Sequence, residues 1–463
     1  MLYNDERRIG LYRLIVLALF ISFGASAQTG TISLKDALAA ADKNYPTVKA
    51  KMNFIKAAEQ NIKEARREYI PSLNMIEQVT YSTSNSLPGS YFNYGVSVSG
   101  SVNPQQLNNP NFGQVSALQA QWPVFTFGQQ VAKVNIAKSQ EQLAETDLAN
   151  EKFQLSIRTA QAYFDLIALI NLRKSEEVNL HRAQSIRNII HASTVNGLKP
   201  GADSSIANAE VSKAKMALID AQNNEQMQRN YLAELIGVPN GNSINPDTSF
   251  LQKLPPQSIQ NGNTDNNPLL LYYKQREALS YANEVFVRRS YLPKISLLGE
   301  AWGRGSGISP DAGNAVNPSF GDGTNLSRFN YAIGIGAVFN IADYPRMSAQ
   351  ANALKFQTMG LQEQTNEQKL ELQTQLNNAD ADYTSSYNKA VESPVLVSAA
   401  TTAYKQMTAM YNSGLINLTD LAQALYNLNY AETQNTISYD NVWKALLFKA
   451  IPTGDMNVLL KQL

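Results

Sequence analysis

The side chains that most often carry chemistry in proteins are scarce in this sequence. Cysteine is absent, which excludes thiolate catalysis, disulfides and cysteine metal sites. The two histidines, His181 and His191, have no carboxylate beside them at a metal-ligand spacing such as H-E-x-x-H. A P-loop, a G-x-S-x-G elbow and a dinucleotide-binding fingerprint are also missing. We therefore expect no enzyme activity, no cofactor and no metal site.

One glycine-rich stretch, GRGSG at 303–307, follows a strand-like pattern. A phosphate-binding glycine loop would lead into a helix, whereas this one leads into Pro, Asp and Asn residues. We interpret it as part of a loop.

Two aspartates recur at a fixed distance after a glycine. Asp203 follows Gly197 by six residues, and Asp420 follows Gly414 by six residues. A long polar helix pattern precedes and follows each glycine, so both glycines are predicted to be turns between helices. In the first turn of the following helix, the carboxylate of Asp420 would be stabilised by the helix dipole.

Other motifs also occur twice, in the same order. REYIPSLNM at 67–75 is similar to RSYLPKISL at 289–297, and WPVFTFGQQ at 122–130 is similar to AVFNIADYP at 337–345. The sequence therefore predicts an internal duplication. The first repeat is residues 28–236, an Asn-, Pro-, Gln- and Gly-rich linker is 237–267, and the second repeat is 268–463. Each repeat reads as helix, strand, loop, strand, very long helix, glycine turn and helix.

The helical patterns are long. Residues 32–68 predict a short helix, a break at Asn44 and Tyr45, and a long helix that begins at Pro46 and ends before Pro71. Residues 128–194 and 345–412 predict two helices, each about 100 Å long at 1.5 Å per residue. Their apolar residues recur at steps of three and four, which is typical of a coiled-coil-like seam or of an ordinary helix-bundle core.

The strand patterns alternate with a period of two. In residues 69–83, 115–125 and 329–341, apolar side chains alternate with small or polar ones, and residues 289–297 begin a fourth strand. A soluble half-buried sheet and a lipid-facing sheet show the same alternation. Secretion, aromatic residues near the strand ends and the long polar loops 84–112 and 303–328 favour lipid.

The N-terminus predicts secretion. Arg7, Arg8 and Arg13 precede an apolar run at 14–23 and a small-residue site before Gln28, so residues 1–27 have the layout of a signal peptide cleaved after Ala27. No later window has 18 consecutive apolar residues, so a mature membrane protein would have to use strands. The net charge of +1 argues against nucleic-acid binding.

About four membrane-type strands cannot close a barrel, because the smallest bacterial barrels have eight. Three chains would supply twelve strands without a free edge, so we expect a homotrimer.

These features together resemble the TolC-like outer-membrane efflux family over essentially the whole mature length. The resemblance rests on SLKDALAAADKNYPTVKA, the two Tyr-x-Pro strand starts, the WPVF-to-Gly transition and the two glycine turns. It implies an α+β membrane protein whose trimer forms a 12-stranded β-barrel in the outer membrane of a Gram-negative bacterium, continued by a periplasmic α-barrel. It also implies a passive export duct of a tripartite efflux or type I secretion system, with a periplasmic adaptor protein and an inner-membrane pump as partners.

The resemblance also implies a periplasmic entrance where the helices converge. Tyr411, Asp420 and Asp203 match the family's gate pattern, whereas Ile416 and Gln423 replace a basic residue and a second Asp. A constriction is expected without the same ionic lock. The alternative from another class is a secreted trimeric coiled-coil structural or adhesive protein without a pore, which would not need duplicated strand pairs.

Overall fold

The computed structural model describes residues 31–85, 106–197, 199–248, 253–259, 262–309, 313 and 315–463. The predicted signal peptide, residues 1–27, lies outside these residues. The chain divides into two compact units. The first contains Met1–Asn53, Thr146–Tyr272 and Thr365–Leu463, and the second contains Phe54–Glu145 and Tyr273–Gln364. Each unit takes segments from both halves of the sequence, so the units are not the predicted repeats, and the division into repeats stays a prediction.

The predicted helices are present with nearly the predicted bounds. The break before Pro46 separates α2 (Leu34–Asn44) from α3 (Pro46–Arg67), and the two long helices are α4 (Gln129–Val195) and α8 (Tyr344–Asn412). The remaining helices are α5 (Gly201–Ile236), α6 (Pro268–Ser290), α7 (Phe320–Thr324), α9 (Leu418–Thr453) and α10 (Asn457–Leu460). Of the helices that the structure describes, none is both long and apolar enough to cross a membrane.

The core of the first unit is built from helices that meet around aromatic side chains. Trp443 of α9 stacks on Phe164 of α4 with ring centroids 6.4 Å apart, and both are fully buried. Tyr163 donates its hydroxyl hydrogen to the Ile32 carbonyl at 2.8 Å and accepts the Asp247 amide at 2.9 Å. These bonds fix a small parallel pair of strands, β1 (Thr31–Ile32) and β4 (Asn245–Pro246), against α4.

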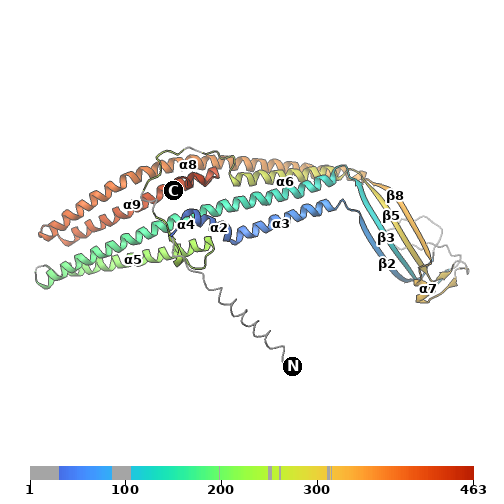
Figure 1. Ribbon diagram of the computed structural model, residues 1–463, viewed down its shortest axis with the longest axis horizontal. Helices are drawn as coiled ribbons and strands as arrows, with labels where there is room; N and C mark the ends of the chain where they lie inside the picture. Colours follow the sequence, from blue (N-terminus) through green and yellow to red (C-terminus); the bar gives the residue numbers. More distant parts are fainter. Residues whose placement is uncertain are drawn as a thin grey trace, which may run out of the picture. The chain divides into compact units, whose positions relative to one another are not determined.

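The second unit contains a four-stranded antiparallel sheet (Figure 1). Its strands are β2 (Ser72–Ser82), β3 (Asn111–Phe125), β5 (Lys294–Ser306) and β8 (Arg328–Val338), in the order β2-β3-β5-β8. We call the end at Ser82 and Arg328 the loop end and the end at Ser72 and Val338 the helix end. The four predicted strands are therefore present.

The strand register places alternate residues on two different faces. The apolar face carries Leu73, Met75, Val79, Tyr81, Leu118, Trp122, Leu297, Phe329, Tyr331, Ile333 and Ile335. The mixed face carries four of the five charged residues of these strands, Lys294, Glu300, Arg304 and Arg328, together with amides such as Gln119. The fifth, Glu77, is on the apolar face, as its position in the alternation predicted.

Three predictions about the loops and strand ends are wrong. Residues 303–306 of the GRGSG stretch belong to β5, where they pair with residues 113–116 of β3. Glycine is required at 305 because the backbone carbonyls of Asn325 and Gly323 lie 2.5 and 2.9 Å from where a Cβ would be. The segment 303–328 is accordingly not one loop, since it also holds β6 (Ile308–Ser309), β7 (Ala315–Val316) and α7. The strand predicted at 329–341 ends at Val338, because Ile341–Asp343 form a 3-10 helix.

Candidate entrance site at two helix hairpins

The first hairpin joins α4 to α5 through Gly197. Gly197 has φ 72°, a left-handed conformation that glycine adopts without steric cost. Its amide donates to the Thr194 carbonyl at 3.0 Å and closes the end of α4. Pro200 then precedes α5, which brings Asp203 into the first helical turn. The predicted turn is therefore present here.

The second hairpin joins α8 to α9 through Gly414, which has φ 75°. The Gly414 amide donates to the Tyr411 carbonyl at 3.0 Å, and the Leu415 amide donates to the Met410 carbonyl at 2.9 Å. Asn417 caps α9: its side chain accepts the Asp420 amide at 2.9 Å, and Asp420 Oδ2 accepts the Asn417 amide at 3.4 Å. This reciprocal pair is a capping box, which stabilises the start of the helix.

A hydrogen bond joins the two hairpins. The Tyr411 hydroxyl of α8 donates to Asp203 Oδ2 of α5 at 3.2 Å, although the residues are 208 positions apart in the sequence. The Tyr411 ring is only 4% exposed and packs with Ile190 and Leu418. Lys199, from the turn of the first hairpin, places its Nζ 4.4 Å from the centroid of that ring. This cation–π contact is a second interaction of the first hairpin with Tyr411.

The environment of Tyr411 keeps its hydroxyl protonated. Burial raises the pKa of Tyr411 to about 12, and the negative charge of Asp203 and the hydrogen bond to it act in the same direction. At neutral pH the hydroxyl is therefore always available as a donor. The contact between the hairpins is a neutral donor bound to a carboxylate, and at 3.2 Å it is longer than a strong bond of this kind.

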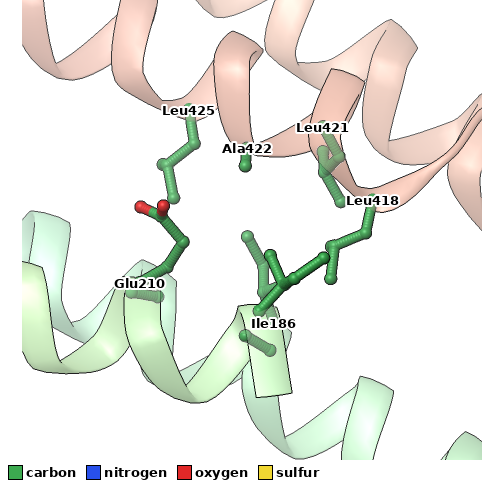
Figure 2. A pocket seen from close by; sticks show the side chains of 9 residues that line it. Ile186, Glu210, Leu418, Leu421, Ala422 and Leu425 are labelled. Carbon is green, nitrogen blue, oxygen red and sulfur yellow. The ribbon is translucent and has the colours of Figure 1, made fainter. Parts of the chain in front are cut away.

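Apolar side chains surround this contact, yet they leave a small pocket. The pocket is lined by Ala183, Ile186, Ile206, Ala207, Glu210, Leu418, Leu421, Ala422 and Leu425. Figure 2 shows Glu210 on one side of the pocket and Ala422 and Leu425 of α9 on the other. The packing between the hairpins is incomplete here, so fewer van der Waals contacts hold them together than in a filled core.

Polar contacts farther along the helices also join α4 to α9. Arg182 makes a two-pronged ion pair with Glu432, with both N–O distances 2.7 Å. Hydrogen bonding to Glu432 raises the pKa of Arg182 above its usual value. Glu176 Oε1 accepts the side-chain amide of Asn429 at 3.2 Å. The hairpins are thus connected by separate polar contacts, of which the Tyr411–Asp203 bond is nearest the turns.

The structure brings together only part of the predicted site. Tyr411 and Asp203 touch, whereas the hydrogen-bond partner found for the Asp420 carboxylate is its own N-cap, Asn417. Ile416, where the family pattern has a basic residue, packs against the Tyr411 cluster, and Gln423 donates to Asn427 at 2.9 Å. Lys199 was missed. Its signal was present in the sequence, because Lys199 is two residues after Gly197, the spacing at which Ile416 follows Gly414.

Comparison with known families supports this description. Residues 37–238 match the family model described as outer membrane efflux protein. The resemblance predicted from the sequence is therefore confirmed. No curated protein sequence matches the chain.

Solved structures share the fold across nearly the whole chain. The outer membrane protein VceC from Vibrio cholerae has a TM-score of 0.71 at 16% identity, over 91% of this chain and 96% of that one. The CmeC outer membrane channel of Campylobacter jejuni has a TM-score of 0.73 at 13% identity, over 91% and 85%. The open-state MtrE outer membrane channel of Neisseria gonorrhoeae has a TM-score of 0.69 at 15% identity, over 91% and 89%. These likenesses show that the chain has the fold of outer-membrane channels.

Proposed function

We propose that this outer membrane efflux protein is the outer-membrane channel component of a tripartite efflux or type I secretion system. In this role it is a passive duct of the Gram-negative outer membrane that extends into the periplasm. The observation that carries the proposal is the exposure of the apolar face of the sheet.

The apolar face is too exposed for a protein surface in water. The exposed fractions of Ile333, Tyr331 and Met75 are 85%, 81% and 80%. Large contiguous apolar surfaces on a protein mark a place where lipid or another protein binds. Edge strands of 11 residues, β2 and β8, also have the length that a tilted strand needs to cross the hydrocarbon.

Aromatic side chains gather at both ends of this sheet. At the loop end, the ring centroids of Tyr81 and Phe112 are 4.6 Å apart, and those of Phe112 and Phe320 are 5.1 Å apart. The helix end has a second set that consists of Trp122, Phe125, Phe127, Tyr291, Phe339 and Tyr344. Two aromatic girdles around an apolar band are typical of strands that cross an outer membrane.

Glu77 is the exception on the apolar face, and its charge is partly satisfied. Its carboxylate accepts hydrogen bonds from the Gln114 side-chain amide at 2.6 Å and from the Ser116 hydroxyl. Both donors are on the same face of the neighbouring strand. An acidic side chain costs less on the lipid face of a barrel than Lys or Arg does.

A single chain leaves the sheet open at β2 and β8, its two edge strands. Hydrocarbon offers no hydrogen-bond partner to an open edge, so the edges must pair with other copies. Three chains give twelve strands, and we therefore propose a homotrimer. The mixed face then lines the lumen, and the two hairpins form the periplasmic entrance, where an adaptor protein and a pump would dock.

The same observation argues against a secreted coiled coil without a pore. Such a stalk needs the helices but has no use for an apolar sheet face of this size between two aromatic girdles. It would aggregate through that face in water.

Tryptophan fluorescence tests the assignment of the faces. The chain has three tryptophans: Trp122 is on the apolar face, Trp302 is on the mixed face, and Trp443 is 1% exposed in the core of the first unit. In liposomes whose acyl chains carry bromine near the headgroups, we expect bromine to quench Trp122. The contributions of the three residues are separated with single Trp→Phe variants.

The outcome is decisive when it is combined with planar-bilayer recordings. Quenching of Trp122 without quenching of Trp302, together with ion conductance by a trimer, supports the duct. Equal protection of Trp122 and Trp443 from bromine, or an absence of conductance, would favour the coiled-coil alternative.

A further inference from the structure

Two arginines lie directly opposite each other at the loop end of the sheet. The register of β5 and β8 pairs Arg304 with Arg328, and both residues are exposed on the mixed face. Directly opposed side chains in antiparallel strands have Cβ atoms about 4.5–5.5 Å apart, and like charges at this separation destabilise the pair. An anion placed between them would remove this repulsion.

The described part of the chain supplies no such anion. The ion pairs found there include neither Arg304 nor Arg328. Glu300 is on the same face but four residues away along β5, or about 13 Å at 3.3 Å per residue. Its carboxylate already accepts the side-chain amide of Gln119 at 3.0 Å.

The other carboxylate near this end belongs to α7, which packs on the opposite face. The Cα of Gly323 faces Phe112, and the carbonyls of Gly323 and Asn325 lie over Gly305. Phe112 and Gly305 are on the apolar face by register. Asp322 of α7 accepts the side-chain amide of Asn317 at 2.5 Å. The sheet thus separates Asp322 from the two arginines.

We infer that Arg304 and Arg328 form a binding site for oxyanions, the class that includes phosphate, sulfate and carboxylate groups. A guanidinium group presents its N–H donors in a planar fork that matches two oxygens of such an anion. Two guanidinium groups on one pair of strands supply two forks and two positive charges. The position of this site in the lumen, where it would recur three times, rests on the proposed function, whereas the site itself lies within one chain.

Trp302 is a built-in reporter for this site. It lies two residues before Arg304 on the same strand and on the same face, about 7 Å away. Its fluorescence is obtained as the difference between the protein and the Trp302→Phe variant. Iodide, an anionic quencher, should be concentrated beside Trp302 by the arginines, whereas acrylamide, a neutral quencher, should not.

The experiment compares the two quenchers in the full-length protein in detergent at low salt. A unit charge about 7 Å away in water changes the local iodide concentration about threefold. In Arg304→Gln/Arg328→Gln we therefore expect the iodide quenching constant of Trp302 to fall several-fold, with acrylamide quenching unchanged. Lys294→Gln is the matched control, because Lys294 is on the same face of the same strand but at the helix end. It should leave both constants unchanged.

Competition identifies the ligand. Inorganic phosphate and succinate should each displace iodide from the unaltered protein at concentrations that have no effect on the double variant. Displacement by both assigns the site to oxyanions in general, and displacement by phosphate alone restricts it to phosphate groups. Equal iodide quenching in the unaltered protein and the double variant, or no displacement by either anion, would overturn the inference. The readout needs neither a trimer nor conductance, so failure here leaves the proposed duct untouched, and failure of the duct leaves this site standing.

Discussion

At the scale of the residue, the hydrogen bond between Tyr411 and Asp203 is the contact most relevant to the proposed entrance. It joins two hairpins through a single donor and a single acceptor, and Lys199 lies over the same ring. Lys199 of the first hairpin thus places a positive charge beside Tyr411, whereas Ile416 of the second hairpin carries none. If the hairpins form the entrance, this contact is the simplest one to break for opening.

Replacement of Tyr411 by Phe tests the hydroxyl separately from the ring. The variant loses one long hydrogen bond, which stabilises by about 1 kcal/mol, but keeps the ring packing. Tyr411→Ala also leaves a cavity, so its effect should be larger. We expect resting single-channel conductance to rise in the order unaltered protein, Tyr411→Phe, Tyr411→Ala. Identical conductance in all three would show that the entrance is closed elsewhere.

Asp420 has a structural role that must be separated from any role in ion selectivity. Asp420→Asn keeps an oxygen that can accept the Asn417 amide but removes the charge, whereas Asp420→Ala removes both. If three Asp420 carboxylates meet at the entrance, both variants should lose cation selectivity in reversal-potential measurements. Both variants should lose the interaction of the charge with the helix dipole, about 0.3–1 kcal/mol. The Ala variant also loses the bond that Asp420 Oδ2 accepts from the Asn417 amide. Unchanged selectivity in both variants would leave Asp420 as a capping residue only.

At the scale of the element, the helices and the sheet obtain their stability in different ways. The long helices bury small residues such as Ala160, Ala207 and Ala214, which allow close approach along many turns. α9 also buries an ionic group, since Lys444 contacts Asp165 of α4 at 2.5 Å and Asp440 at 2.6 Å. Because such buried groups gain or lose protons, the stability of the helix packing depends on pH.

Asp440 should make the stability of the first unit depend on pH. Burial raises the pKa of Asp440 to about 6 from an ordinary value of 3.8, although Lys444 acts in the opposite direction. Because the pKa of Asp440 is higher in the folded than in the unfolded state, its protonated carboxyl favours folding. This contribution to the free energy of unfolding is complete below about pH 4 and is lost as the pH rises through 6. The loss is on the order of 3 kcal/mol. In Asp440→Asn, the thermal unfolding midpoint should change less with pH between 4 and 7 than in the unaltered protein. The same pH dependence in both proteins would contradict the raised pKa of Asp440.

The two faces of β8 predict opposite responses to the same substitution. Ile335→Asp places a charge on the apolar face, where a charged group costs up to a few kcal/mol in lipid. Gly334→Asp is the matched control on the mixed face, because nothing lies within 4 Å of a Cβ at Gly334. Gly336 is a poorer control, since Leu298 Cδ1 would be 3.1 Å from the new Cβ. We expect only Ile335→Asp to reduce the amount of heat-stable trimer in outer membranes, and equal tolerance would indicate a soluble sheet.

At the scale of the whole molecule, neither compact unit is a continuous stretch of sequence. Each is assembled from segments of both halves. The sheet therefore requires strands from both halves, with β3 and β5 paired in its centre. Neither half alone can form the four-stranded sheet.

The topology of the whole molecule is tested by proteolysis of intact cells. The segments between β2 and β3 and between β5 and β8 both join paired strands at the loop end, and barrel proteins keep their long loops outside the cell. Added protease should cut within these segments and spare the helices. Residues 320–324 should resist, because α7 packs on Phe112 through Phe320 and Gly323. Cuts that appear only after the outer membrane is permeabilised would reverse the orientation.

The sequence by itself determined the elements and the faces of the strands. A period of two in residues 329–338 and the glycines at 197 and 414 act over a few residues, so β8 and both turns could be predicted locally. The same local reasoning failed at GRGSG. There the glycine is required by backbone atoms of residues 323 and 325, which come close only after the chain has folded back on the strand.

Only the tertiary structure decided which side chains meet. Tyr411 and Asp203 are 208 residues apart, and Arg304 and Arg328 become opposed only through the register of β5 with β8. Lys199 could be found by spacing, but its position over the Tyr411 ring depends on how α4 and α5 pack beside α8. Periodicity describes one element at a time, whereas contacts between elements depend on packing and register, which no local pattern contains.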